Sequence, residues 1–115
     1  MWPGFSSTRF SLINRNIIWA TAHIRGGMEK GMKWWKEGKL LNKKNTFEDY
    51  ISVAKYLINQ KYTSDGKIIG MGGSAGGLLM GAVVNQEPNL FLGMIMAVPF
   101  VDSLSTNLDH SLPLT

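Results

Sequence analysis

Residues 70–81 read GMGGSAGGLLMG. This stretch places a single serine among glycines, between a strand-like and a helix-like segment. The residues before the turn, KIIGM, are typical of a short buried strand, and those after it, GLLMGAVVNQ, are typical of a helix. Gly72, Ser74 and Gly76 match the G-x-S-x-G pattern of a nucleophile elbow, a sharp turn from strand to helix. The sequence therefore predicts that Ser74 stands at the carboxyl end of a strand.

The chemistry expected of this turn is nucleophilic attack by the Ser74 hydroxyl. The turn is tight, so we expect Gly72 and Gly76 to omit side chains that would collide across it, with Gly73 part of the same bend. The amide of Ala75 lies at the start of the helix, where unpaired N–H groups can stabilise an oxyanion. A phosphate-binding loop is the alternative, but the P-loop lysine and the G-x-G-x-x-G spacing are missing.

A serine becomes a good nucleophile only when a histidine takes its proton. In α/β-hydrolases the acid and the histidine follow the serine in the chain. Only His110 follows Ser74, and the candidate acids Asp102 and Asp109 lie too close to His110 to leave room for a further strand. A complete triad within these residues is not expected. His23 precedes the elbow, and we interpret it as a polar loop residue.

The sequence around the elbow alternates between helical and strand patterns. Strands are expected at residues 16–24, 67–71 and 92–100. Residues 10–15 are expected to be the end of a helix, and further helices are expected over 44–62 and from 77 to about 87. Thr46 and Asp49 have the spacing of a capping box at the start of the second helix. This alternation predicts an α/β fold with a parallel sheet, and three strands are too few for a whole one. The pattern is therefore that of the central part of a larger α/β domain, truncated at both ends.

The amino-acid composition excludes several classes of protein and of binding site. The 115 residues are 44% hydrophobic and contain no cysteine, which excludes a disulfide framework and a thiolate metal site. No apolar run could span a bilayer, and the first residues lack a signal-peptide pattern, so a cytoplasmic location is expected. Neither a cofactor nor a metal ion is expected.

The net charge of +4 is concentrated in residues 30–44, which hold Trp34 and Trp35 among six lysines. Such a stretch could bind nucleic acid or an anionic membrane. Gly31 and Gly38 interrupt it, so we favour a solvated segment whose tryptophans pack inward, with no nucleic-acid or membrane partner. The lysines are Lys30, Lys33, Lys36, Lys39, Lys43 and Lys44.

Taken together, several segments resemble the catalytic domain of the prolyl oligopeptidase family of serine peptidases, and within it the branch that cleaves after arginine or lysine. The resemblance covers residues 5–115. The segments that carry it are HIRGGMEKG, GKLLNKKNTFEDY, MGGSAGGLLMG, NQEPNLF, VPFVD and LPLT. It implies an α/β-hydrolase domain capped by a β-propeller, with short peptides as substrates.

By this resemblance Ser74 matches the nucleophile, and Ala75 supplies one oxyanion donor through its amide. The other matched positions form the elbow and a structural loop beside the active site: Gly72, Gly73, Gly76, Arg25, Gly26, Gly27 and Glu29. Met28 stands where a third glycine is usual.

The same resemblance implies that residues 1–115 are a fragment of a catalytic domain. It places a second oxyanion donor, a tyrosine, before this chain, and the triad acid, the histidine and the glutamates that hold a basic side chain after it. We therefore expect the isolated chain to be inactive and other fragments of a split enzyme to be partners. The alternative is a non-catalytic remnant or an interaction module that uses residues 30–44.

Overall fold

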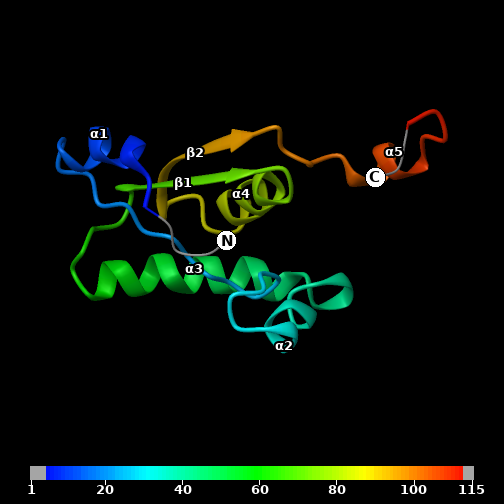
Figure 1. Ribbon diagram of the computed structural model, residues 1–115, viewed down its shortest axis with the longest axis horizontal. Helices are drawn as coiled ribbons and strands as arrows, with labels where there is room; N and C mark the ends of the chain where they lie inside the picture. The colour runs from blue at the N-terminus through cyan, green and yellow to red at the C-terminus, as the bar shows by residue number, and fades with distance from the viewer. Residues whose placement is uncertain (1–4, 113–115) are drawn as a thin grey trace. The chain divides into compact units, whose positions relative to one another are not determined.

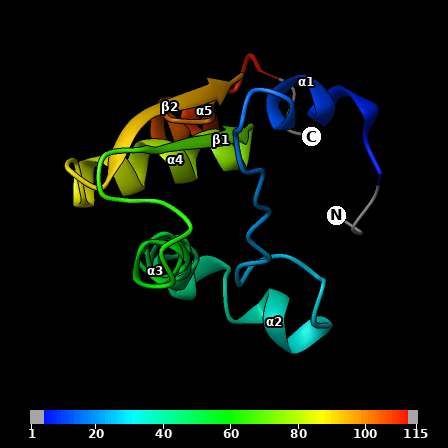
Figure 2. The same cartoon turned by 90° about the vertical axis from the view of Figure 1, so that its left-hand side faces the viewer.

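A computed structural model describes residues 5–112 of the chain (Figures 1 and 2). They form two compact units, of which the first ends at Ser64 and the second begins at Asp65. The elements of the first unit are η1 (Ser7–Arg9), α1 (Phe10–Ile13), α2 (Met32–Lys36), η2 (Leu40–Asn42) and α3 (Lys44–Asn59). Those of the second are β1 (Ile68–Gly73), α4 (Ala75–Gln86), β2 (Phe91–Ala97) and α5 (Ser103–Leu108).

The second unit is a strand–helix–strand motif. β1 and β2 pair in parallel, with Gly70 opposite Met94 and Gly73 opposite Ala97 (Figure 1). Parallel neighbours need a crossover connection, which α4 supplies. The strands expected at 67–71 and 92–100 and the helix between them are thereby confirmed.

The core of the second unit lies between α4 and one face of the sheet. Met80 and Val83 are fully buried, and Leu79 is nearly so, because these α4 positions recur at helical spacing. Leu90, just before β2, and Phe91, its first residue, complete this core. Burial of these five side chains anchors the helix that begins directly after Ser74.

In the first unit α3 is the longest helix, and it buries Thr46, Ile51 and Ala54. The expected capping box is wrong. The helix begins at Lys44, so Thr46 lies inside it, and no side chain caps its N-terminus. Thr46 and Asp49 instead make contacts with residues more than 20 positions earlier in the chain.

The strand expected over 16–24 is also wrong. Within residues 5–112 this segment pairs with no other strand, and Ile17 and Ile18 are exposed. A strand is held by a neighbouring ladder, so an apolar run without such a neighbour is not a strand, whatever its pattern. Two of the three expected strands are therefore present in this part of the chain. The helix end expected at residues 10–15 is present as α1, which follows directly on η1.

Candidate active site

Ser74 occupies the turn between β1 and α4, as its sequence context predicts. Its backbone adopts φ 54° and ψ −117°, a left-handed φ that is uncommon for a residue with a side chain. Its N–H donates to the carbonyl of Ala97 at 3.0 Å, and its own carbonyl accepts from the N–H of Gly77 at 2.9 Å. Ser74 is exposed. The strand–turn–helix geometry of a nucleophile elbow is present.

The two elbow glycines differ in what surrounds them. A Cβ added to Gly72 would lie in contact with the Gly76 carbonyl oxygen and 2.6 Å from its carbon, so no side chain fits there. A Cβ added to Gly76 would have no heavy atom of the described chain within 4 Å, apart from its own helix and neighbours. The described residues therefore require the absence of a side chain at Gly72 but not at Gly76 taken alone. The backbone of Gly76 itself fills the space beside Gly72.

Ala75 is the first residue of α4, so its amide lies at the positive end of the helix. The N–H groups of Gly77 and Leu78 donate to the Ser74 carbonyl, whereas no backbone carbonyl of residues 5–112 accepts from Ala75. An amide in this position can donate to an oxyanion that forms beside Ser74. Its role as oxyanion donor stays a prediction.

Sequence reasoning missed the contacts that residues beyond β2 make with the elbow. The N–H of Phe100 donates to the carbonyl of Ser74 at 3.1 Å. A Cβ on Gly77 would lie 2.6 Å from both Cα and Cβ of Pro99. The segment VPFVD carried part of the family resemblance, and this was the one available signal.

Asp102 and Asp109, the candidate triad acids of the second unit, accept hydrogen bonds from residues two or three positions later in the chain. The Asp102 carboxylate accepts from the N–H of Ser105 at 3.1 Å and so caps α5. Asp109 accepts from the hydroxyl of Ser111 at 2.6 Å and from its N–H, and these bonds lower the pKa of Asp109. Both carboxylates thus have local hydrogen-bond partners, and the expectation that no complete triad lies within these residues stays a prediction.

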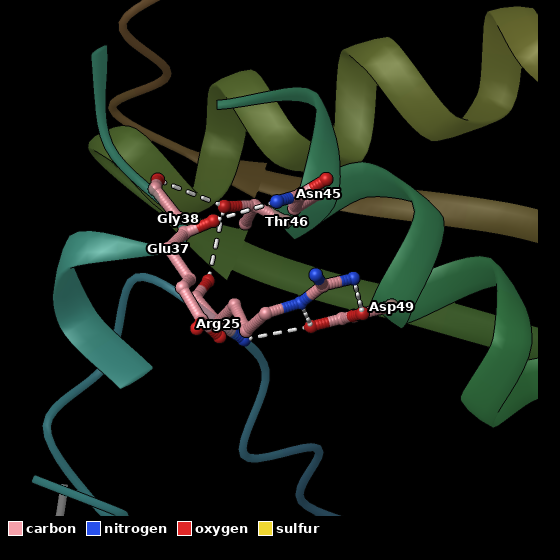
Figure 3. A network of polar contacts seen from close by, with 6 residues as sticks. All are labelled: Arg25, Glu37, Gly38, Asn45, Thr46 and Asp49. Atoms are coloured by element: carbon pink, nitrogen blue, oxygen red, sulfur yellow. Dashed lines mark hydrogen bonds and ion pairs between the residues drawn. The ribbon is translucent and has the colours of Figure 1, made fainter. Parts of the chain in front are cut away.

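In the first unit, the predicted loop residue Arg25 is fixed by Asp49 of α3 (Figure 3). The Arg25 side chain donates twice to the carboxylate, at 2.8 and 2.5 Å, and the Arg25 backbone N–H donates a third bond at 2.9 Å. The hydrogen bonds from Arg25 lower the pKa of Asp49. A two-pronged Arg–carboxylate pair of this kind is among the stronger polar contacts in proteins.

A second set of contacts joins the same loop to the segment before α3. The buried hydroxyl of Thr46 lies 3.0 Å from the carbonyl of Arg25 and 3.1 Å from that of Gly38 (Figure 3). Gly26 adopts φ 97°, and a Cβ there would press on Gly38 and Thr46. The arrangement supports the structural role expected of Arg25 and Gly26. A place for this loop beside the active site stays a prediction.

His23 belongs to the same loop region. Its Nδ1 lies 3.5 Å from a carboxylate oxygen of Glu29. A Cβ added to Gly27 would meet that carboxylate, so the glycine leaves room for the Glu29 side chain. These contacts fit the interpretation of His23 as a polar loop residue.

In the basic segment 30–44, two lysines lie over the rings of two tryptophans of the same segment. The Nζ atom of Lys30 lies 4.6 Å from the ring centroid of Trp34, and that of Lys39 lies 3.5 Å from the ring centroid of Trp35. Both tryptophans are half-buried. Contacts within the segment thus cover part of each ring, and the inward packing that the sequence analysis favoured is only partial.

The part of the chain that the structure describes holds neither a cluster of metal-ligating side chains nor a helix that could span a membrane. Across residues 5–112, no three acidic, histidine or cysteine side chains gather as ligands of an ion. None of the helices in that range combines the length and the hydropathy needed to cross a bilayer.

Comparison with known proteins gives these features a family context. Residues 3–115 match the model of the prolyl oligopeptidase family. The chain is 50% identical over its whole length to dipeptidyl aminopeptidase BI of Pseudoxanthomonas mexicana. It is 51% identical over 113 residues, 98% of this chain, to Protease 2 of Moraxella lacunata. It spans 16% of the length of each of these two relatives.

Solved structures show a likeness to the same family. Oligopeptidase B from Leishmania major superposes with a TM-score of 0.75 at 51% identity, over 81% of this chain and 13% of that one. Oligopeptidase B from Trypanosoma brucei gives the same TM-score and coverage at 48% identity. These matches confirm the expected α/β-hydrolase fold class and the likeness to oligopeptidase B (protease II). The chain belongs to the prolyl oligopeptidase family.

Proposed function

We propose that a protein carrying this chain is a serine peptidase that hydrolyses peptide bonds after arginine or lysine through an acyl-enzyme on Ser74. The observation that carries the proposal is the backbone of Ser74. A left-handed φ of 54° at a strand-to-helix turn is strained for serine, and such strain is typical of functional sites. The family match supports the same residue.

In the proposed reaction the Ser74 Oγ attacks the carbonyl carbon of the scissile bond while a histidine takes its proton. The Ala75 amide donates to the oxygen that becomes negative. The histidine then protonates the leaving amine, the C–N bond breaks, and an ester to Ser74 remains. Water hydrolyses this ester and regenerates the hydroxyl. By the family resemblance, the acid, the histidine and the second oxyanion donor come from outside residues 1–115.

The choice of substrate rests on the relatives. The chain is about equally similar to Protease 2 and to two oligopeptidase B structures, one of which is described with covalently bound antipain. A covalent adduct in that relative supports covalent chemistry in this family. Preference for a basic residue follows from the resemblance to oligopeptidase B. Part of that resemblance, in residues 113–115, lies outside the described residues.

The proposal is tested in a full-length chain that contains these residues, either the natural protein or a chimera in which they replace the matching segment of Protease 2. We expect hydrolysis of a peptide substrate with arginine before the scissile bond. Ser74→Ala abolishes turnover, whereas Ser105→Ala, at an exposed serine of α5, leaves it unchanged. Turnover that survives Ser74→Ala would refute the assigned nucleophile.

The pairing of Lys30 with Trp34 and of Lys39 with Trp35 favours a structural use of segment 30–44. We therefore propose no second function for it.

A further inference from the structure

The chain bends sharply directly after β2. Val98 adopts φ 42°, and a left-handed φ is a genuine outlier for a β-branched residue. Its side chain is 83% exposed, so burial within this unit does not compensate for the strain. Some other interaction must hold the backbone of Val98 in this conformation.

Two hydrogen bonds link this bend to Ser74. The residue before Val98, Ala97, accepts from the Ser74 N–H at 3.0 Å. The second residue after it, Phe100, donates its N–H to the Ser74 carbonyl at 3.1 Å. Both backbone polar groups of Ser74 are thus paired with the two ends of the Val98 bend. A different φ at Val98 would move Ala97 and Phe100 relative to each other and so disturb these two bonds to Ser74.

Packing reinforces the link. Pro99 lies against the first turn of α4, so close that a Cβ on Gly77 would be 2.6 Å from its Cα and Cβ. The bend therefore contacts the elbow on the helix side as well as at Ser74 itself. One turn further along α4, a Cβ on Gly81 would make only ordinary contacts, at 3.8 Å from Val101 and 3.9 Å from Met96.

We infer that the Val98–Phe100 bend positions Ser74 for catalysis. The two strained residues stand at the carboxyl ends of neighbouring parallel strands, and each holds the other in its left-handed conformation. The inference rests on the proposed function, because it concerns the same serine. It adds that Val98, Pro99 and Gly77 act on the reaction through the direction of the Ser74 side chain, without touching substrate.

The test compares two alanine substitutions on α4 in the full-length chain described above. Gly77→Ala pushes Pro99 away and should shift the bend, and with it Ser74. Gly81→Ala adds the same methyl group four residues later, where it fits. Active-site titration with a fluorophosphonate counts functional sites, so turnover per titrated site is insensitive to partial unfolding. KM for an arginine-containing peptide reports on substrate binding.

We expect Gly77→Ala to lower kcat per titrated site by about 10- to 100-fold with KM changed less than about twofold, because small misplacements of a reacting group have effects of this size. Gly81→Ala keeps both parameters. Unchanged turnover in Gly77→Ala, with Ser74→Ala inactive, would overturn the inference and leave the proposed function intact. Activity in Ser74→Ala would instead overturn the proposed function.

If Gly77→Ala does not fold, Val98→Pro provides the second test. Proline fixes φ at about −65°, so position 98 can no longer adopt the φ of 42° that the bend requires. We expect kcat per titrated site to fall about tenfold or more, with KM for the arginine-containing peptide nearly unchanged. Full turnover per titrated site in Val98→Pro would overturn the inference.

Discussion

At the scale of single residues, the elbow shows how much a local pattern can and cannot predict. The G-x-S-x-G spacing predicts that Ser74 lies in the turn between strand and helix and that Ala75 begins the helix, and the structure has both there. Gly72 is also required, but for a different reason from the one expected. The Gly76 backbone, not a Gly76 side chain, occupies the space that a Gly72 side chain would need. Spacing alone could not distinguish these two cases.

This difference predicts opposite effects for the same substitution at the two glycines. Gly72→Ala forces a methyl group against the backbone of Gly76 and should destabilise the protein by about 1–3 kcal/mol. Gly76→Ala places the methyl group in open space within α4 and should stabilise it by about 0.5–1 kcal/mol. Thermal unfolding of the full-length variants measures both. Equal destabilisation by the two substitutions would contradict the structure of the turn.

At the scale of elements, the sequence predicts helices and strands correctly where neighbouring residues determine them. It fails where contacts with residues far away in the sequence determine the structure. The β1–α4–β2 motif has local signals, namely an apolar strand, a glycine-rich turn and Pro88 after the helix. The capping box failed because Thr46 and Asp49 bind Arg25, which lies 21 and 24 positions earlier. The Val98 bend was not expected because its partner, Ser74, is also distant in sequence.

The Arg25–Asp49 contact gives a pH-dependent prediction. Because Arg25 lowers the pKa of Asp49 in the folded protein, ionised Asp49 stabilises the fold above its unfolded pKa of about 3.9. This stabilisation is lost as the pH falls through the folded pKa. Asp49→Asn should therefore cost about 1–3 kcal/mol at pH 7, and less below about pH 4.

The measurement is the difference in unfolding free energy between wild type and Asp49→Asn, followed from pH 7 to pH 3. Glu48→Gln is the matched control, since it removes an exposed carboxylate one residue earlier on α3. A difference between wild type and Asp49→Asn that stays constant across this range would show that the ionised pair is not what stabilises the loop.

At the scale of the molecule, α4 covers one face of the sheet of the second unit, and the other face is exposed among the described residues. Gly70 and Met94, on the side of α4, are buried or half-buried, whereas Ile69, Met71 and Ile95 on the other side are more than half exposed. Parallel sheets are normally covered on both faces. The chain spans 16% of the length of two relatives, and we propose that further parts of a longer protein cover this face.

A polypeptide limited to residues 1–115 should therefore bind a hydrophobic dye such as ANS and aggregate readily. We expect no sharp thermal transition for it in a calorimeter, whereas the full-length chain shows one. A monomeric sample of the 115 residues that unfolds cooperatively, without dye binding, would contradict this prediction.

The central claim is that Ser74 is the nucleophile, and its most direct test is the site of covalent labelling. The full-length chain is treated with a fluorophosphonate, digested, and analysed by tandem mass spectrometry. We predict one adduct, on the Ser74 hydroxyl, which is lost when the protein is first denatured, because an unfolded serine has no base to activate it. An adduct on another serine, with Ser74 unmodified, would contradict the account.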